Sequence, residues 1–310
     1  MSSSTAKSPH RWRKVGHFRL PADGEPIKTR RLGPFLIEVV HRWRDGRTRL
    51  WNSRAYRKGF APRLLPRHGE ETSAPRTPRL FLLSPKQLNW WISVLFMIGA
   101  LHFVAGSVMA LGELVSSFTN NLTYFIGSLF FTSAAYIQHF QAINADRFVA
   151  GGSGGATGKR WLAWQPERID FWVTITQFVG TILFNFNTFN PFWTQGTVQE
   201  DLFVWIPNIE GSILFMISGT LAMMEICHGW CWRFRDLEWW LTFINFLGCV
   251  AFLLSALLAF ANPHPIWENK TVWSNAFTLI GAVCFFVGAY LMLPEMSARA
   301  PALSDDLEPA

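Results

Sequence analysis

Five polar side chains interrupt long runs of apolar residues, and they are the first candidates for chemistry: Glu210, His102, Asn185, Gln177 and Asn245. Polar groups are costly in hydrocarbon, and those that occur there usually face the interior of a helix bundle. A carboxyl group, an imidazole and several amides can together bind a small polar solute or pass a proton. The set therefore predicts an intramembrane polar site.

Three of these residues are expected at a similar depth. At a rise of 1.5 Å per residue, His102 and Asn185 lie ~20 Å from the start of their segments, and Glu210 lies ~10 Å from the opposite side. In a hydrocarbon core of ~30 Å these positions nearly coincide. We expect Glu210 to face the interior at this level. The alternative is that it serves packing alone, either protonated or paired with an amide or imidazole.

A second candidate lies in "CHGWC", where Cys227, His228 and Cys231 bring two thiols and an imidazole within five residues. Thiolates and imidazoles are the ligands of zinc, but a fourth ligand is not evident and the spacing is not that of a zinc finger. The alternative to a metal site is a pair of reduced thiols at the end of a helix.

The chain offers no legible catalytic set. A Ser-His-Asp arrangement, a pair of catalytic carboxylates and the motif His-Glu-x-x-His are all missing from the 310 residues. We therefore expect no enzymatic activity and no cofactor.

Six apolar stretches must position the polar residues, and each is long enough to cross a bilayer as a helix. They cover 88–111, 122–143, 171–189, 202–224, 239–261 and 272–294. The predicted fold class is an all-α membrane protein with six transmembrane helices. Its expected divisions are a basic segment at 1–87, helix hairpins at 88–143, 170–225 and 239–295, a Gly-rich linker at 144–169, a loop at 226–238 and an acidic tail at 296–310.

The distribution of Lys and Arg predicts the orientation. With both termini in the cytoplasm, 27 of the 28 basic residues lie on the cytoplasmic side and only Lys270 lies outside. Such a bias is typical of cytoplasmic loops. We expect a multi-pass protein of a bacterial inner (plasma) membrane, so that the lipid bilayer is its first partner. The net charge of +7 reflects this bias rather than a nucleic-acid partner.

One phrase occurs three times: "NWWIS" at 89–93, "DFWVT" at 170–174 and "EWWLT" at 238–242. A glycine follows each, namely Gly99, Gly180 and Gly248. The return helices also match, with "GSLFFTSAAY", "GSILFMISGT" and "GAVCFFVGAY" starting at glycines 127, 211 and 281. Fourteen positions after these glycines come Gln141, Glu225 and Glu295. These matches predict three repeats of a two-helix hairpin, all inserted the same way.

The segment 1–87 is basic and rich in Pro, Ser and Gly over 1–30 and 59–80, which predicts partial disorder there. Between these parts, β-prone residues flank Asp45-Gly46, so we expect a β-hairpin near 35–53. The hairpin is expected in the cytoplasm, on the helix ends or on anionic lipid.

The first hairpin, "LNWWISVLFMIGALHFVAGS" followed by "NLTYFIGSLFFTSAAYIQ", resembles the YrhK-like family of small bacterial membrane proteins. The resemblance covers residues 85–145, through the aromatic helix start and the "IGSLFF" second helix. It implies a bacterial inner-membrane protein, and it supplies no catalytic residue or substrate.

Two functions are compatible with these features. The leading prediction is a non-enzymatic structural or interaction module embedded in the membrane, and the sequence permits a homo-oligomer. The alternative is a transporter or channel for a small solute or proton, using the intramembrane site around Glu210.

Overall fold

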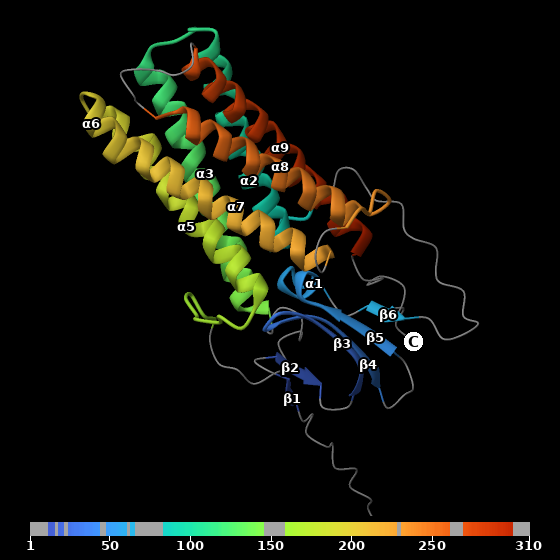
Figure 1. Ribbon diagram of the computed structural model, residues 1–310. Coiled ribbons are helices and arrows are strands. Elements are labelled where there is room, and N and C mark those ends of the chain that lie inside the picture. Colours follow the sequence, from blue (N-terminus) through green and yellow to red (C-terminus); the bar gives the residue numbers. More distant parts are fainter. Residues whose placement is uncertain are drawn as a thin grey trace, which may run out of the picture.

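A ring of six long helices stands on a small N-terminal sheet (Figure 1). The computed structural model describes residues 12–15, 18–21, 24–43, 48–60, 63–65, 83–145, 159–227, 231–260 and 269–299. The long helices are α2 (Leu88–Leu111), α3 (Ser117–Ile143), α5 (Ile169–Phe189), α7 (Ile206–Cys227), α8 (Leu237–Leu258) and α9 (Lys270–Arg299). Each packs against the next in chain order, and α9 packs against α2, which closes the ring.

Between α5 and α7 the chain forms three short helical turns: η1 (Asn190–Phe192), α6 (Thr197–Glu200) and the π-helical η2 (Asp201–Trp205). The last two run directly into α7, so that the helical segment begins before the predicted start at position 202.

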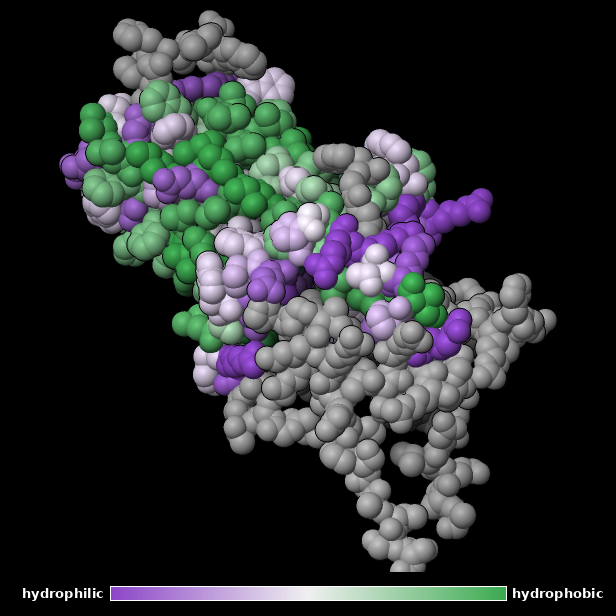
Figure 2. All heavy atoms as spheres, turned by 60° about the horizontal axis from the view of Figure 1, so that its bottom comes forward, coloured by the Kyte–Doolittle hydropathy of each residue, from purple (hydrophilic) through white to green (hydrophobic). Residues whose placement is uncertain are grey.

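Five helical segments of the described chain are long and apolar enough to cross a membrane: Leu88–Leu111, Ile169–Phe192, Thr197–Cys227, Leu237–Leu258 and Lys270–Ala298. The protein is therefore a multi-pass membrane protein. The sixth long helix, α3, is not in this set, although the sequence predicted a span at 122–143. Its first turns carry Ser117, Asn120 and Asn121, and polar residues return near its end. The face of the bundle that Figure 2 shows is predominantly hydrophobic, as a lipid-facing surface requires.

The same close contact occurs in each helix hairpin. A Cβ atom added to Gly99 would lie 3.0 Å from the Gly127 carbonyl oxygen, one on Gly180 would lie 3.1 Å from Gly211 O, and one on Gly248 would lie 3.2 Å from Gly281 O. Each pair of backbones therefore meets at glycine, where the missing side chain permits the approach.

A hydrogen bond also recurs at the three helix starts. The indole N–H of Trp91 donates to Pro85 O at 3.0 Å, that of Trp172 to Pro166 O at 2.8 Å, and that of Trp240 to Phe234 O at 2.9 Å. In each case the acceptor lies six residues earlier. The repeated aromatic phrase thus fixes the chain entering each odd helix in the same way.

Six buried phenylalanines, one from each long helix, meet inside the ring and form what we call the phenylalanine cluster: Phe103, Phe131, Phe184, Phe215, Phe252 and Phe285. Each follows a contact glycine by four residues, so it lies one turn further along the same face. Ring centroids are 5.0 to 5.4 Å apart within hairpins and 5.8 to 6.0 Å apart between them. The cluster fills the axis of the bundle.

The N-terminal part contains more strands than the predicted hairpin. Strands β4 (Phe35–Trp43) and β5 (Thr48–Asn52) pair antiparallel as expected. They belong to a four-stranded antiparallel sheet with β3 (Gly24–Leu32) and β6 (Arg63–Leu65), and β1 (Trp12–Val15) pairs with β2 (Phe18–Pro21). Parts of the regions expected to be disordered therefore form strands. Pairing with β4 and β5 satisfies the backbone groups of β3 and β6, and β1 and β2 pair with each other.

We expect Gly180→Ala to destabilise the bundle by about 1 to 3 kcal/mol, the usual cost of overpacking. The new methyl group would lie 2.7 Å from Phe215 Cδ1 and 3.1 Å from the Gly211 carbonyl oxygen. Neither neighbour can move away freely, since one belongs to the phenylalanine cluster and the other to a helix backbone. Denaturant unfolding of the purified protein in detergent measures the effect.

Gly112→Ala is the matched control, because the nearest side chain there is Leu114, which is exposed and can turn away. Equal losses in the two variants would show that the helices do not meet at Gly180.

Candidate functional site

A short helix, α1 (Ser53–Arg57), projects from the sheet against one end of the bundle, which we call the α1 end (Figure 1). Asn52 caps the helix, and its side-chain oxygen accepts a hydrogen bond from the Ala55 amide at 3.2 Å. Gly59, at φ +74°, ends the turn in a conformation that glycine adopts readily. These local signals limit α1 to little more than one turn. Four of its five residues are buried.

Three cations that follow β5 are buried where α1 meets the bundle: Arg54, Arg57 and Lys58. Two carboxylates from the bundle pair with them, Glu225 of α7 and Glu295 of α9, whose exposed fractions are 0% and 2%. Arg54 donates to Glu295 at 2.5 Å, and Lys58 donates to the second oxygen of the same carboxylate. We call these five residues the ion-pair cluster.

Glu225 has two neighbours on α1. Ser53 Oγ donates to Glu225 Oε1 at 2.6 Å, and Arg57 Nη2 lies 3.1 Å from Glu225 Oε2. Removing such groups from water costs several kcal/mol per ion, so the cluster tolerates burial only because opposite charges are adjacent. The loss of either carboxylate would leave a buried cation without its ion-pair partner, namely Arg57 for Glu225 and Lys58 for Glu295.

Two residues of the repeated phrase also hold this region. Asn89 Nδ2 donates to the Lys58 carbonyl oxygen at 2.8 Å, and the Glu238 carboxylate lies 3.3 Å from Arg54 Nη1. The third member, Asp170, pairs instead with Arg168 of its own segment. All three occupy the second position of their helices rather than the N-cap, where the backbone N–H groups still favour them.

The pKa of Lys58 reflects its position. Burial, together with the charge of Arg54, lowers the pKa of Lys58 to about 7, although the Glu295 carboxylate acts in the opposite direction. The ammonium group is thus stabilised mainly by Glu295.

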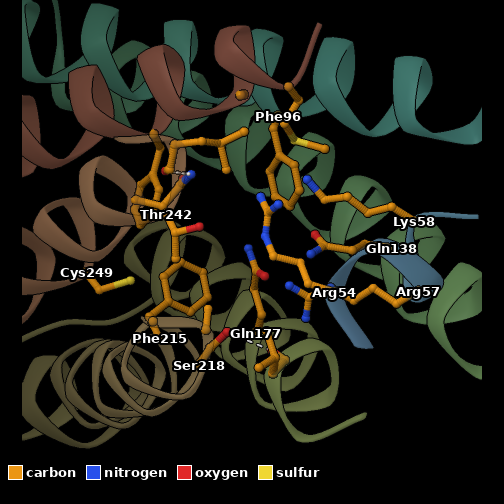
Figure 3. Close-up of a pocket in the computed structure, with 18 residues that line it drawn as sticks. Arg54, Arg57, Lys58, Phe96, Gln138, Gln177, Phe215, Ser218, Thr242 and Cys249 are labelled. Atoms are coloured by element: carbon orange, nitrogen blue, oxygen red, sulfur yellow. Dashed lines mark hydrogen bonds between the residues drawn. The ribbon is translucent and has the colours of Figure 1, made fainter. Parts of the chain in front are cut away.

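A cavity of about 90 Å³ lies inside the ring between α1 and the phenylalanine cluster (Figure 3). Its lining includes Arg54, Arg57 and Lys58 from the α1 side, and Phe96, Phe215 and Phe285 from the bundle. The amides of Gln138, Gln177 and Asn245 and the hydroxyls of Ser218 and Thr242 complete its polar lining. Among the described residues, no Asp or Glu lines it.

The predicted polar site is divided by this arrangement. Gln177 and Asn245 both line the cavity, so these two are brought together. Asn185 is half-buried elsewhere, where its side-chain oxygen accepts a hydrogen bond from Thr132 of α3 at 3.2 Å. His102 contacts the Ile98 carbonyl oxygen of its own helix at 2.8 Å and stacks on Phe130.

The prediction that Glu210 faces the bundle interior is wrong. Its side chain is exposed on the outside of the bundle instead of facing the interior. The reason is helical geometry, since the next residue, Gly211, forms the close contact with Gly180, and adjacent residues point about 100° apart. The inward-facing site of Glu210, His102 and Asn185 is therefore not formed.

The thiol prediction is also corrected. Cys227 and Cys231 form a disulfide, so they are not the reduced thiols that we expected. His228 lies outside the described residues. Within the part of the chain that the structure describes, no group of three His, Cys, Asp or Glu side chains could hold a metal ion.

No family model, curated protein or solved structure matches this chain. The ion-pair cluster and the cavity are therefore the observations from which function is inferred. Sequence reasoning had noted Glu225 and Glu295 as matching positions at helix ends. It did not connect them with the cations at 54–58, which belong to a different part of the fold.

Proposed function

We propose that this protein is a non-enzymatic structural or interaction module of the membrane that holds a basic cytoplasmic domain against its helix bundle. The observation that carries the proposal is the ion-pair cluster. Buried contacts between Arg54 and Glu295, and between Arg57 and Glu225, join residues of α1 to two separate helices. Such contacts favour one orientation of α1 on the bundle, because a buried charge that lost its partner would be strongly destabilising.

The architecture that we propose for this module has six spans and three hairpin repeats. The recurring glycine contacts and indole hydrogen bonds support repetition. A length of 27 residues supports a spanning role for α3, since such a helix is about 40 Å long. We also propose that the chain is related to the YrhK-like family, on the basis of the aromatic helix start and the "IGSLFF" segment.

We prefer this module to the transporter that was the alternative prediction. Transport through the ring would require a polar path along its axis, whereas the phenylalanine cluster fills that axis. The carboxylate expected at the centre of such a path, Glu210, is exposed on the outside.

The orientation that we propose places the α1 end at the cytoplasmic face of a bacterial inner membrane, as the 27-to-1 distribution of basic residues favours. Exposed basic residues of β3, including Lys28 and Arg30, are then available to anionic lipid.

Trypsin digestion of sealed vesicles tests the docking and the orientation together. Trypsin cleaves after Lys and Arg, so Arg54, Arg57 and Lys58 are potential sites that docking should protect. In inside-out vesicles we expect rapid cleavage at the exposed Lys159–Arg160 loop and protection at 54–58. Mass spectrometry of the released peptides measures both.

The double variant Glu225→Gln/Glu295→Gln is expected to lose the protection, while cleavage at 159–160 stays unchanged. Fast cleavage at 54–58 in the unmodified protein would contradict the docking. Cleavage at 159–160 only in right-side-out vesicles would contradict the orientation.

A further inference from the structure

Arg57 has hydrogen-bonding capacity that its neighbours do not use. Its Nη2 lies 3.1 Å from Glu225, but its Nε and Nη1 atoms are buried and have no hydrogen-bond partner. A buried donor without a partner destabilises the fold, and more so when it is charged. Arg57 lines the cavity and is only 5% exposed, so an acceptor inside the cavity would satisfy it.

The charged groups that line the cavity are all cations, and each also pairs with a carboxylate that does not line it. Arg54, Arg57 and Lys58 enter it from one side, as Figure 3 shows, and the described lining includes no carboxylate. The amides of Gln138 and Gln177 come from α3 and α5, and each can turn an NH₂ group inward. Asn245 of α8 donates one N–H to the Leu241 carbonyl oxygen at 2.8 Å, which leaves its second N–H as a donor. Guanidinium and amide donors around a common space are the groups that recognise oxyanions.

The volume limits the occupant. One water requires about 10 to 15 Å³ of cavity volume. The cavity of about 90 Å³ therefore holds roughly six waters, or one tetrahedral oxyanion with a few waters. A nucleotide is too large. Phe215 and Phe285 form the apolar end, and they leave the polar lining on the α1 side as the place where a charge would be held.

We propose that this cavity binds one small oxyanion of the phosphate or sulfate class, with Arg57 as the principal ligand and the three amides as further donors. This goes beyond the structural role of the ion-pair cluster and does not depend on it. Glu225 does not line the cavity, but its Oε2 atom lies 3.1 Å from Arg57 Nη2 and has no hydrogen-bond partner, so its negative charge limits the affinity for an anion.

Inorganic phosphate is the probe for the experiment. The full chain is placed in nanodiscs of phosphatidylcholine, and chloride is replaced by phosphate at constant ionic strength. We expect a phosphate-dependent rise in Tm and saturable binding by calorimetry, since a ligand that binds the folded state stabilises it.

Two variants give opposite expectations. Arg57→Gln/Glu225→Gln removes the donor together with its buried partner, so the fold keeps its charge balance while phosphate affinity falls about tenfold or more. Glu225→Gln alone removes the negative charge and should tighten phosphate binding severalfold. Size-exclusion profiles establish that both variants are folded. Arg30→Gln, on the exposed face of β3, is the control and should bind like the unmodified protein.

Three results would overturn the proposal. They are no phosphate-dependent shift in the unmodified protein, a shift that persists in Arg57→Gln/Glu225→Gln, and weaker binding in Glu225→Gln. Phosphatidic acid in the nanodisc, tested without free phosphate, separates the two sources of a phosphate group. A shift with that lipid alone would assign the site to a lipid headgroup and overturn a free anion.

Discussion

Replacement of Glu295 by alanine is expected to lower the free energy of unfolding by about 3 to 5 kcal/mol. Arg54 and Lys58 are both buried, and Glu295 is a hydrogen-bond partner of each. Without it, Arg54 retains Glu238, whose side chain is 25% exposed, and Lys58 loses its carboxylate partner. The ammonium can release its proton because its pKa is already near 7, which places the expected loss toward the lower end of this range.

Denaturant unfolding in a single detergent, followed by tryptophan fluorescence, measures this loss. Glu210→Ala is the matched control, because it removes the same side chain from an exposed position of α7. Its effect should stay within about 0.5 kcal/mol. Similar effects of Glu295→Ala and Glu210→Ala would show that the ion-pair cluster does not hold α1.

Phe285→Ala is expected to cost about 2 to 3 kcal/mol. Phe285 and Phe252 form the middle of the phenylalanine cluster, and the Phe285 ring centroid lies 5.2 Å from Phe252, 5.8 Å from Phe215 and 6.0 Å from Phe131. Truncation leaves a cavity on the order of 100 Å³, and each Å³ costs about 24 cal/mol. Lost dispersion contacts dominate here, since lipid would solvate a separated apolar helix almost as well as protein does.

Phe186→Ala provides the comparison, because Phe186 is 53% exposed on the outside of α5. It should change the unfolding free energy by less than about 1 kcal/mol. A larger loss for Phe186→Ala than for Phe285→Ala would contradict a central role of the cluster.

Liposomes that contain the Phe285→Ala variant provide a second measurement. A proton leak seen only in this variant would identify the cluster as the barrier along the axis.

Local physics made the helices predictable. A long apolar segment must pair its own backbone groups, so each predicted stretch became a helix, within a few residues at its ends. The β4–β5 pair followed in the same way from β-prone residues around Asp45-Gly46. Strand β3 was missed because most of it falls within 1–30, where the polar composition predicted partial disorder, and only pairing with β4 makes it a strand.

The direction of Glu210 was also within reach of the sequence. The depth of a residue in the membrane follows from counting residues along the helix. The direction of its side chain depends also on its angular position around the helix axis. Ile126 and Ile280 occupy the positions before the matching glycines 127 and 281, and both are exposed. Aliphatic residues at the equivalent positions thus marked the face that points outward. By contrast, the contact of Arg54 with Glu295 joins residues 241 positions apart, and no local pattern contains it.

The unequal ends of the three hairpins have a consequence for assembly. Gln141, Glu225 and Glu295 occupy matching places, and all three are buried at the α1 end. In the three-repeat architecture that we propose, three identical acids would offer a docking element three equivalent orientations, related by one-third turns. The neutral amide of Gln141 removes this degeneracy, because the cations at 54–58 then find their two carboxylate partners in only one of the three orientations. A ring of similar hairpins can therefore bind the asymmetric N-terminal domain in a single rotational position.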